Sequence, residues 1–167
     1  MQEGIPTTTV PGEIERMFEE CHGMVFRTAY RITGNAADAE DVLQGVFLRL
    51  LRRDRSAEPL ENPESYLRRA AVNASLDVVR ARQESAGVAL EEAPPGPADQ
   101  RELRDLLRRA LATLSPRAAE LFALRFFEGY SNPEIARMLG ISQVHVAVLL
   151  HRTRKQLQKE VRTYLGV

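Results

Sequence analysis

The chain has 167 residues, enough for one medium domain or two small ones, and its formal net charge of +0 does not favour a polyanion partner for the chain as a whole. The charge is unevenly distributed: twelve basic and six acidic residues lie between positions 101 and 167, so the preceding residues carry the balancing excess of acid. This asymmetry is typical of a basic nucleic-acid-binding module joined to a second unit.

Several classes of protein are disfavoured by what the sequence lacks. No apolar run approaches membrane-spanning length, the N-terminus has no secretory pattern, and the single Cys21 excludes an internal disulfide. The sequence therefore predicts a cytoplasmic protein with no membrane insertion. Cys21 has no evident base or metal partner, and no glycine-rich phosphate loop is present. We therefore expect no enzyme, no catalytic residue, no cofactor and no metal.

The first 85 residues predict a tail and a group of helices. Residues 1–12 are rich in Thr, Pro and Gly and predict a frayed tail, and an amphipathic helix is expected over Glu13–Thr33. After Gly34, Asn35 predicts the N-cap of a second helix over 36–53, and Asn62-Pro63 opens a third over about 63–83. The predicted apolar positions of the first two helices are Ile14, Met17, Phe18, Val25, Phe26, Ala29, Ile32, Ala39, Val42, Leu43, Val46, Phe47, Leu50 and Leu51.

The remainder of the chain predicts a linker and a second helical group. Residues 86–98 are acidic and rich in Pro and Gly, which is typical of a flexible interdomain linker. A helix over about 98–113 and a second helix capped by Ser115-Pro116 are expected next. We therefore predict an all-α fold of two small helical domains, 13–85 and 99–167, joined by a flexible linker.

A helix-turn-helix is predicted within the second group. Ser131 is placed to cap a short helix, Glu134 to close a capping box, and Gly140 to end that helix in a left-handed turn. Ser142 then caps a further helix, whose inward positions are Val146 and Leu150. An ordinary helical hairpin is the alternative, but capping, turn and packing positions all agree with a helix-turn-helix.

Three segments stand out, in this order: DAEDVLQGVFLRLLRR (residues 38–53), YLRRAAVNASLDVVRAR (66–82) and LSPRAAELFALRFFEGYSNPEIARMLGIS (114–142). Together they resemble the extracytoplasmic-function (ECF) group of bacterial RNA polymerase sigma factors. Two domains without a middle one are the layout of that group, and the resemblance covers roughly residues 13–157. The helix-turn-helix alone is shared with LuxR-type regulators, whereas the three segments together are specific.

The resemblance implies a role for each segment of the N-terminal domain, which is similar to sigma region 2. The second helix would bind the clamp helices of the largest subunit of core RNA polymerase; the residues that match the family or face solvent there are Asp38, Asp41, Gln44, Leu48 and Arg49. The third helix and the loop before it would open the −10 promoter element and hold a flipped base, a task that needs cations and stacking groups. The candidates are Asn62, Tyr66, Arg68, Arg69, Asn73, Arg80 and Arg82. Asn73 and Asp77, four residues apart, are equally consistent with a local structural pair.

The resemblance also implies that the C-terminal domain, similar to sigma region 4, enters the major groove of the −35 element. Base contacts are expected from Ser142, Gln143, Val144 and His145, and phosphate contacts from Arg117, Arg125, Arg152, Arg154 and Lys155. The linker would thread the RNA exit channel of the polymerase, although a plain solvated tether is equally consistent with its composition. The implied partners are core RNA polymerase, promoter DNA and an anti-sigma factor that clamps between the two domains.

The sequence departs from the family pattern at several positions. Ala147, Val148 and Leu149 stand where the recognition helix usually has Lys, Ser and Arg, so that with Val144 they form an apolar face. Such a face either contacts thymine methyls or binds a protein. In the first domain the departures are Gly45 for Glu, Leu51 and Tyr66 for Trp, and Val72 for Arg.

These observations leave more than one hypothesis open. A promoter-specificity subunit is favoured. The alternative is a divergent sigma-like protein that acts through protein partners, for example as a decoy for an anti-sigma factor. A LuxR-type regulator with a helical sensor domain is disfavoured by the segment at residues 38–53.

Overall fold

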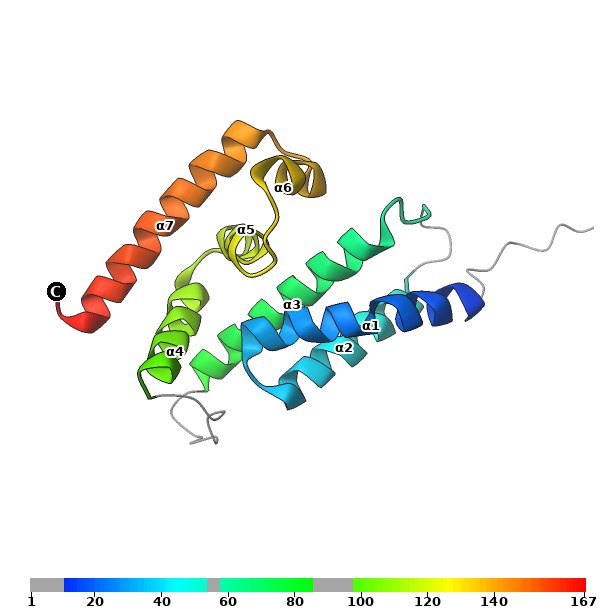
Figure 1. Ribbon diagram of the computed structural model, residues 1–167, viewed down its shortest axis with the longest axis horizontal. Helices are drawn as coiled ribbons and strands as arrows, with labels where there is room; N and C mark the ends of the chain where they lie inside the picture. The colour runs from blue at the N-terminus through cyan, green and yellow to red at the C-terminus, as the bar shows by residue number, and fades with distance from the viewer. Residues whose placement is uncertain (1–10, 54–57, 86–97) are drawn as a thin grey trace, which may run out of the picture.

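The computed structural model describes residues 11–53, 58–85 and 98–167, and all the regular structure within these ranges is α-helical (Figure 1). The helices are α1 (Pro11–Thr33), α2 (Ala36–Leu51), α3 (Pro63–Glu84), α4 (Ala98–Thr113), α5 (Pro116–Phe126), α6 (Asn132–Leu139) and α7 (Gln143–Leu165). The prediction of an all-α fold with two helical groups is confirmed. Helix α1 begins at Pro11, two residues before its predicted start, and the predicted linker before Ala98 lies outside the described residues.

Helices α1, α2 and α3 form an N-terminal unit around one hydrophobic core. Its buried side chains are Val25, Ala29, Ala39, Val42, Val46, Phe47, Leu50, Leu67, Ala71 and Ala74. Two residues predicted to face inward do not: Phe18 is 44% exposed and Leu51 is 58% exposed. The apolar stripe on each of these helices is wider than the seam that the other helices cover, so its edge remains on the surface.

The predicted helix-turn-helix is present in the C-terminal unit, α4–α7. Ser131 caps α6 and forms a complete capping box with Glu134, Gly140 adopts the left-handed conformation with φ of 65°, and Ser142 caps α7. Val146 is 0% and Leu150 5% exposed, so both inward positions of α7 are confirmed. The turn and the two caps thus fix where α7 begins and which of its faces points away from the core.

The capping box of α6 makes a pH-dependent contribution to stability. Hydrogen bonds from the Ser131 amide (2.7 Å) and hydroxyl (2.8 Å) hold the pKa of the Glu134 carboxyl below its usual value. A carboxyl with a lowered pKa stabilises the folded state above its unfolded pKa, and this contribution disappears as pH falls through the folded pKa. We expect Glu134→Gln to lower the melting temperature slightly at neutral pH and to match wild type in acid. Thermal unfolding across pH measures this, with the exposed Glu102→Gln as control; a difference that persists unchanged in acid contradicts it.

The two units are packed against one another, which the sequence did not predict. Ile32 at the end of α1 and three residues of α3 belong to the same hydrophobic core as the buried side chains of α4–α7. Arg108 of α4 donates from Nε to the carbonyl oxygen of Ile32 at 3.1 Å. Gly34, whose φ is 69°, lies beside the same guanidinium. A Cβ atom at this position would be only 2.0 Å from Nη2 of Arg108. Figure 1 shows α4 and α5 next to α3, with α5 seen nearly end-on.

Candidate functional site

The outer face of α2 carries four of the five residues predicted to contact polymerase. Asp41, Gln44, Leu48 and Arg49 are exposed, whereas Val42, Val46 and Leu50 on the opposite face are buried. Leu48 is 48% exposed and lines a groove of about 640 Å³ between α1 and α2. The other apolar side chains that line this groove are Ile14, Phe18, Phe47 and Leu51. An apolar groove with polar residues around it is typical of a protein-binding surface.

The fifth predicted polymerase residue, Asp38, is instead buried within the N-terminal unit. Its carboxylate accepts two hydrogen bonds from Arg82 of α3, at 2.5 Å from Nε and 2.7 Å from Nη2. Its backbone amide donates to the side chain of the α2 cap, Asn35, at 3.0 Å. This bidentate pair ties the start of α2 to the end of α3. It thereby joins two residues that the sequence assigned to different surfaces, and their contacts with polymerase and DNA stay predictions.

At the start of α3, two of the predicted −10 residues remain accessible. Asn62 is exposed and caps the helix, accepting from the Ser65 amide at 3.0 Å. Tyr66 is 37% exposed, and the guanidinium carbon of Arg53 lies 5.9 Å from its ring centroid. An exposed aromatic ring beside a cation is suited to stacking an unpaired base.

Two residues after Tyr66, Arg68 is held between two carboxylates. It donates to Glu64 of its own helix at 2.9 Å and to Glu128 of the C-terminal unit at 2.6 Å. Burial lowers the pKa of this guanidinium, but the hydrogen bonds with Glu128 and Glu64 outweigh that effect and raise it overall. The positive charge of Arg68 is thus already balanced by carboxylates of the protein in this conformation.

Arg69 and Asn73 also contact the C-terminal unit. Both donate to Oε1 of Glu120, Arg69 from Nε at 2.8 Å and Asn73 from Nδ2 at 3.1 Å. The local pair considered for Asn73 and Asp77 is therefore not formed, and Asp77 pairs with Arg80 at 3.2 Å instead. Arg68, Arg69 and Asn73 are brought together on one face of α3, where their polar groups bind α5 and the turn after it, although the Arg69 side chain stays 35% exposed.

The two acids that cover this face were missed by the sequence analysis, which counted them only as charges. Glu120 lies on α5 three residues before the buried Ala123 and four before the buried Leu124. This spacing puts an acid on the apolar face of the helix, and that was the signal by which its burial could have been predicted. Glu128 lies in the turn after α5 and offers no comparable pattern. Only the folded structure shows that its side chain is 0% exposed.

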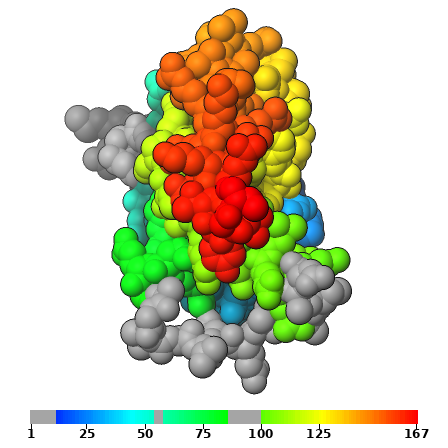
Figure 2. All heavy atoms as spheres, turned by 90° about the vertical axis from the view of Figure 1, so that its left-hand side faces the viewer, coloured from blue at the N-terminus to red at the C-terminus, as the bar shows by residue number. Residues whose placement is uncertain are grey.

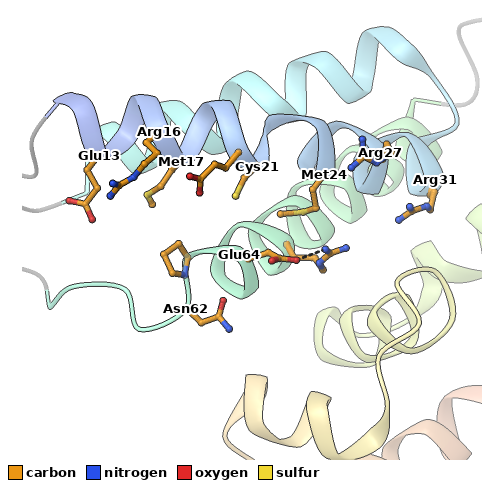
Figure 3. Close-up of a pocket in the computed structure, with 12 residues that line it drawn as sticks. Glu13, Arg16, Met17, Cys21, Met24, Arg27, Arg31, Asn62 and Glu64 are labelled. Atoms are coloured by element: carbon orange, nitrogen blue, oxygen red, sulfur yellow. Dashed lines mark hydrogen bonds and ion pairs between the residues drawn. The ribbon is translucent and has the colours of Figure 1, made fainter.

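A second groove, of about 590 Å³, lies between α1 and the start of α3 (Figure 3). Met17, Cys21 and Met24 project into it from one face of α1, with charged residues of both signs at its rim. Burial, with a contribution from Glu64, raises the pKa of the Cys21 thiol, so that it stays protonated at neutral pH and is not an activated nucleophile. Among the described residues there is no cluster of three metal-binding side chains and no helix apolar and long enough to cross a membrane.

The first turn of α7 presents the residues predicted for base recognition. Gln143, Val144 and His145 are exposed, and the Ser142 hydroxyl accepts from the His145 amide at 3.1 Å, so Ser142 acts as the helix cap. Helix α7 runs along the face of the molecule turned to the viewer in Figure 2.

Further along α7, the predicted apolar face is only partly exposed. Val144 is 73% and Val148 42% exposed, and Ala147 is also exposed. Leu149 is half-buried against the core, so it does not belong to this face.

Two of the predicted phosphate-binding residues lie beside an aromatic ring that was not predicted as a binding residue. Phe126, at the end of α5, is 42% exposed, and the guanidinium carbons of Arg154 and Arg125 lie 4.9 and 5.7 Å from its ring centroid. Arg152 and Lys155 are exposed on α7. Arg117 is 46% exposed and lies 3.5 Å from Glu120. The C-terminal unit thus combines an exposed helix start with a basic, partly aromatic flank.

Comparison with known families and proteins identifies both helical units. Residues 17–85 match the family model for sigma-70 region 2, and residues 104–157 match that for sigma-70 region 4. The chain is 31% identical over 153 residues to the RNA polymerase sigma-E factor of Streptomyces coelicolor, covering 89% of this chain and 86% of that protein. It is 36% identical to the ECF RNA polymerase sigma factor SigE of Mycolicibacterium smegmatis, covering 80% of this chain and 56% of that protein.

Solved structures of similar fold include a sigma factor bound to an anti-sigma factor. The sigma factor RpoE of Bartonella quintana, in complex with the anti-sigma factor NepR, aligns with a TM-score of 0.53 at 22% identity, covering 90% of this chain and 97% of that one. CnrH, in complex with the cytosolic domain of CnrY, aligns with a TM-score of 0.54 at 22% identity, covering 92% and 90%. These two likenesses concern the fold, whereas the sequence matches establish the family. The chain belongs to the extracytoplasmic-function group of RNA polymerase sigma factors.

Proposed function

We propose that three surfaces divide the work of this sigma factor, which directs promoter-specific transcription initiation and is not an enzyme. The outer face of α2 binds core RNA polymerase. The start of α3, with the loop before it, binds the opened −10 element. The start of α7 enters the major groove of the −35 element.

The observation that carries this proposal is that the helix-turn-helix leaves the first turn of α7 exposed. Gly140 and the Ser142 cap fix the start of the helix, and the side chains of its first turn are exposed. The first turn of a recognition helix is where base edges are met, and amide and imidazole groups at Gln143 and His145 supply donors and acceptors for them. Val144 and Val148 add apolar contacts suited to thymine methyl groups.

One observation favours a second candidate function. The exposed valines of α7 form an apolar face without the cations that would hold phosphates there. A sigma-like protein that acts on protein partners, such as a decoy for an anti-sigma factor, would use this face for binding.

We propose further that the protein works in the cytoplasm with the polymerase and has an anti-sigma factor of its own. The support for such a partner is the fold that this chain shares with a sigma factor solved in complex with an anti-sigma factor. We assign residues 13–85 to polymerase and −10 binding and residues 99–167 to −35 binding.

The test is transcription by core RNA polymerase on a library of genomic promoter fragments, with and without the purified protein. We expect a defined set of transcripts only when the protein is added. Polymerase binding without any promoter-dependent transcript would favour the second candidate, and no polymerase binding would contradict the proposal.

A further inference from the structure

Two carboxylates of the C-terminal unit accept hydrogen bonds from three of the α3 residues that were predicted to bind DNA: Arg68, Arg69 and Asn73. Glu128 accepts hydrogen bonds from Thr28 at 2.9 Å, Arg31 at 2.8 Å and Arg68 at 2.6 Å, and its side chain is 0% exposed. Glu120, whose side chain is 6% exposed, accepts from Arg69 and Asn73. We call these seven residues the interdomain network.

An apolar contact lies beside the interdomain network. Val72, Leu76 and Val79 of α3 are 0%, 2% and 3% exposed and share a core with side chains of α4 and α5. Val72 stands at the position where the resembled family segment has Arg. A valine at this position cannot bind phosphate, but it fits the buried seam with the C-terminal unit. Polar and apolar contacts therefore both favour the arrangement in which the two units are packed together, which we call the closed state.

We infer that the C-terminal unit is an intramolecular competitor of −10 DNA, with Glu120 and Glu128 occupying the places of two DNA phosphates on α3. This inference rests on the proposed −10 function of α3. A carboxylate and a phosphate offer an arginine the same charge and the same kind of acceptor oxygens, so a phosphate competes with Glu120 and Glu128 for the N–H donors that they occupy. The face of α2 and the first turn of α7 remain exposed, and so do Asn62 and Tyr66, so the closed state occupies only the part of the −10 surface that carries Arg68, Arg69 and Asn73.

The hydrogen bonding of the closed state is incomplete, which favours separation of the two units when DNA is present. Within the described part of the chain, the Nε atom of Arg68 is buried without a hydrogen-bond partner. An unpaired buried donor costs free energy, and one of the two non-bridging oxygens of a DNA phosphate can accept from it when the units separate. Arg31, 45% exposed, already reaches solvent at the edge of the network.

The experiment uses the full chain with Glu120→Gln and Glu128→Gln combined. The matched control combines Glu102→Gln and Glu160→Gln, which remove the same charge from the C-terminal unit outside the interdomain network. Small-angle scattering of the free protein reports separation of the units without any DNA. We expect a larger radius of gyration for the network variant and the compact wild-type value for the control.

DNA binding is measured on the same proteins, by anisotropy of a fluorescein-labelled single-stranded oligonucleotide of mixed sequence. If the open state of wild type is about 10% populated, opening the molecule tightens apparent binding about tenfold relative to the charge-matched control. Expansion without this gain would overturn the competition and would count against DNA binding by α3. An unexpanded network variant would show that the two carboxylates do not hold the closed state, and an already extended wild type would exclude that state. Either result overturns the inference whether or not the protein initiates transcription.

A second variant tests the apolar contact independently. Val72→Arg places a charge in the buried seam, and we expect the same expansion and a gain in oligonucleotide binding of similar size. Circular dichroism confirms that each variant keeps its helices. A folded Val72→Arg protein that stays compact would contradict the inference even if the glutamine variant proved unstable.

Discussion

Replacing Leu48 with Glu weakens binding to core RNA polymerase by about 30- to 1000-fold, which corresponds to about 2–4 kcal/mol at an interface hot spot. Leu48 is the exposed apolar side chain among the four outward-facing residues of α2, and it borders the groove formed with α1. A partner that covers this groove would bury the new carboxylate without a counter-charge. Anisotropy of labelled protein titrated with core polymerase measures the change.

The chain offers a matched control for this variant. Leu103 is 64% exposed on α4, away from the α2 face, so Leu103→Glu makes the same chemical change outside the proposed interface. We expect the control to bind polymerase like wild type. Equal losses in both variants would show that the effect is not specific to α2, and an unchanged affinity in Leu48→Glu would remove this face from the interface.

Replacing Gln143 and replacing Arg152 should affect promoter binding in different ways. Both side chains are exposed on α7, Gln143 in its first turn and Arg152 two to three turns further along. Loss of a base contact in Gln143→Ala should cost about 1–3 kcal/mol at the preferred −35 sequence and reduce discrimination at one base pair. Loss of a phosphate contact in Arg152→Ala should weaken binding to all sequences alike and lower the salt slope by about 1.

Competition binding of holoenzyme to promoters with single −35 substitutions, at several salt concentrations, separates these effects. Glu160→Gln, also on α7 but far from its first turn, serves as the control and should change neither specificity nor affinity by more than a small amount. A Gln143→Ala protein with unaltered preference at every −35 base pair would exclude base recognition by this residue.

The sequence predicted the features that depend on local physics. Helix caps at Asn35, Ser115, Ser131 and Ser142 and the left-handed Gly140 each follow from a few neighbouring residues, and all are present. The exposed face of α2 followed from helical periodicity in the same way. Such features need no knowledge of which helices meet.

What the sequence did not predict depends on contacts between distant segments. Asp38 pairs with Arg82 and Glu128 with Arg68, and no spacing rule connects residues so far apart in the chain. The arginines of α3 looked like free cations because their partners lie in the other unit. Phe18 looked buried because periodicity alone does not show where the covering helices end.

Footprinting of the holoenzyme on a promoter obtained from the genomic library tests the central claim most directly. Nuclease protection reports occupancy of the −35 element by α7, and permanganate reactivity of unpaired thymines reports opening of the −10 element by α3. We predict both signals with wild type, loss of −35 protection on replacing Gln143 and His145, and loss of −10 reactivity on replacing Tyr66 and Arg69. Holoenzyme that forms but gives neither signal at any promoter would contradict the account.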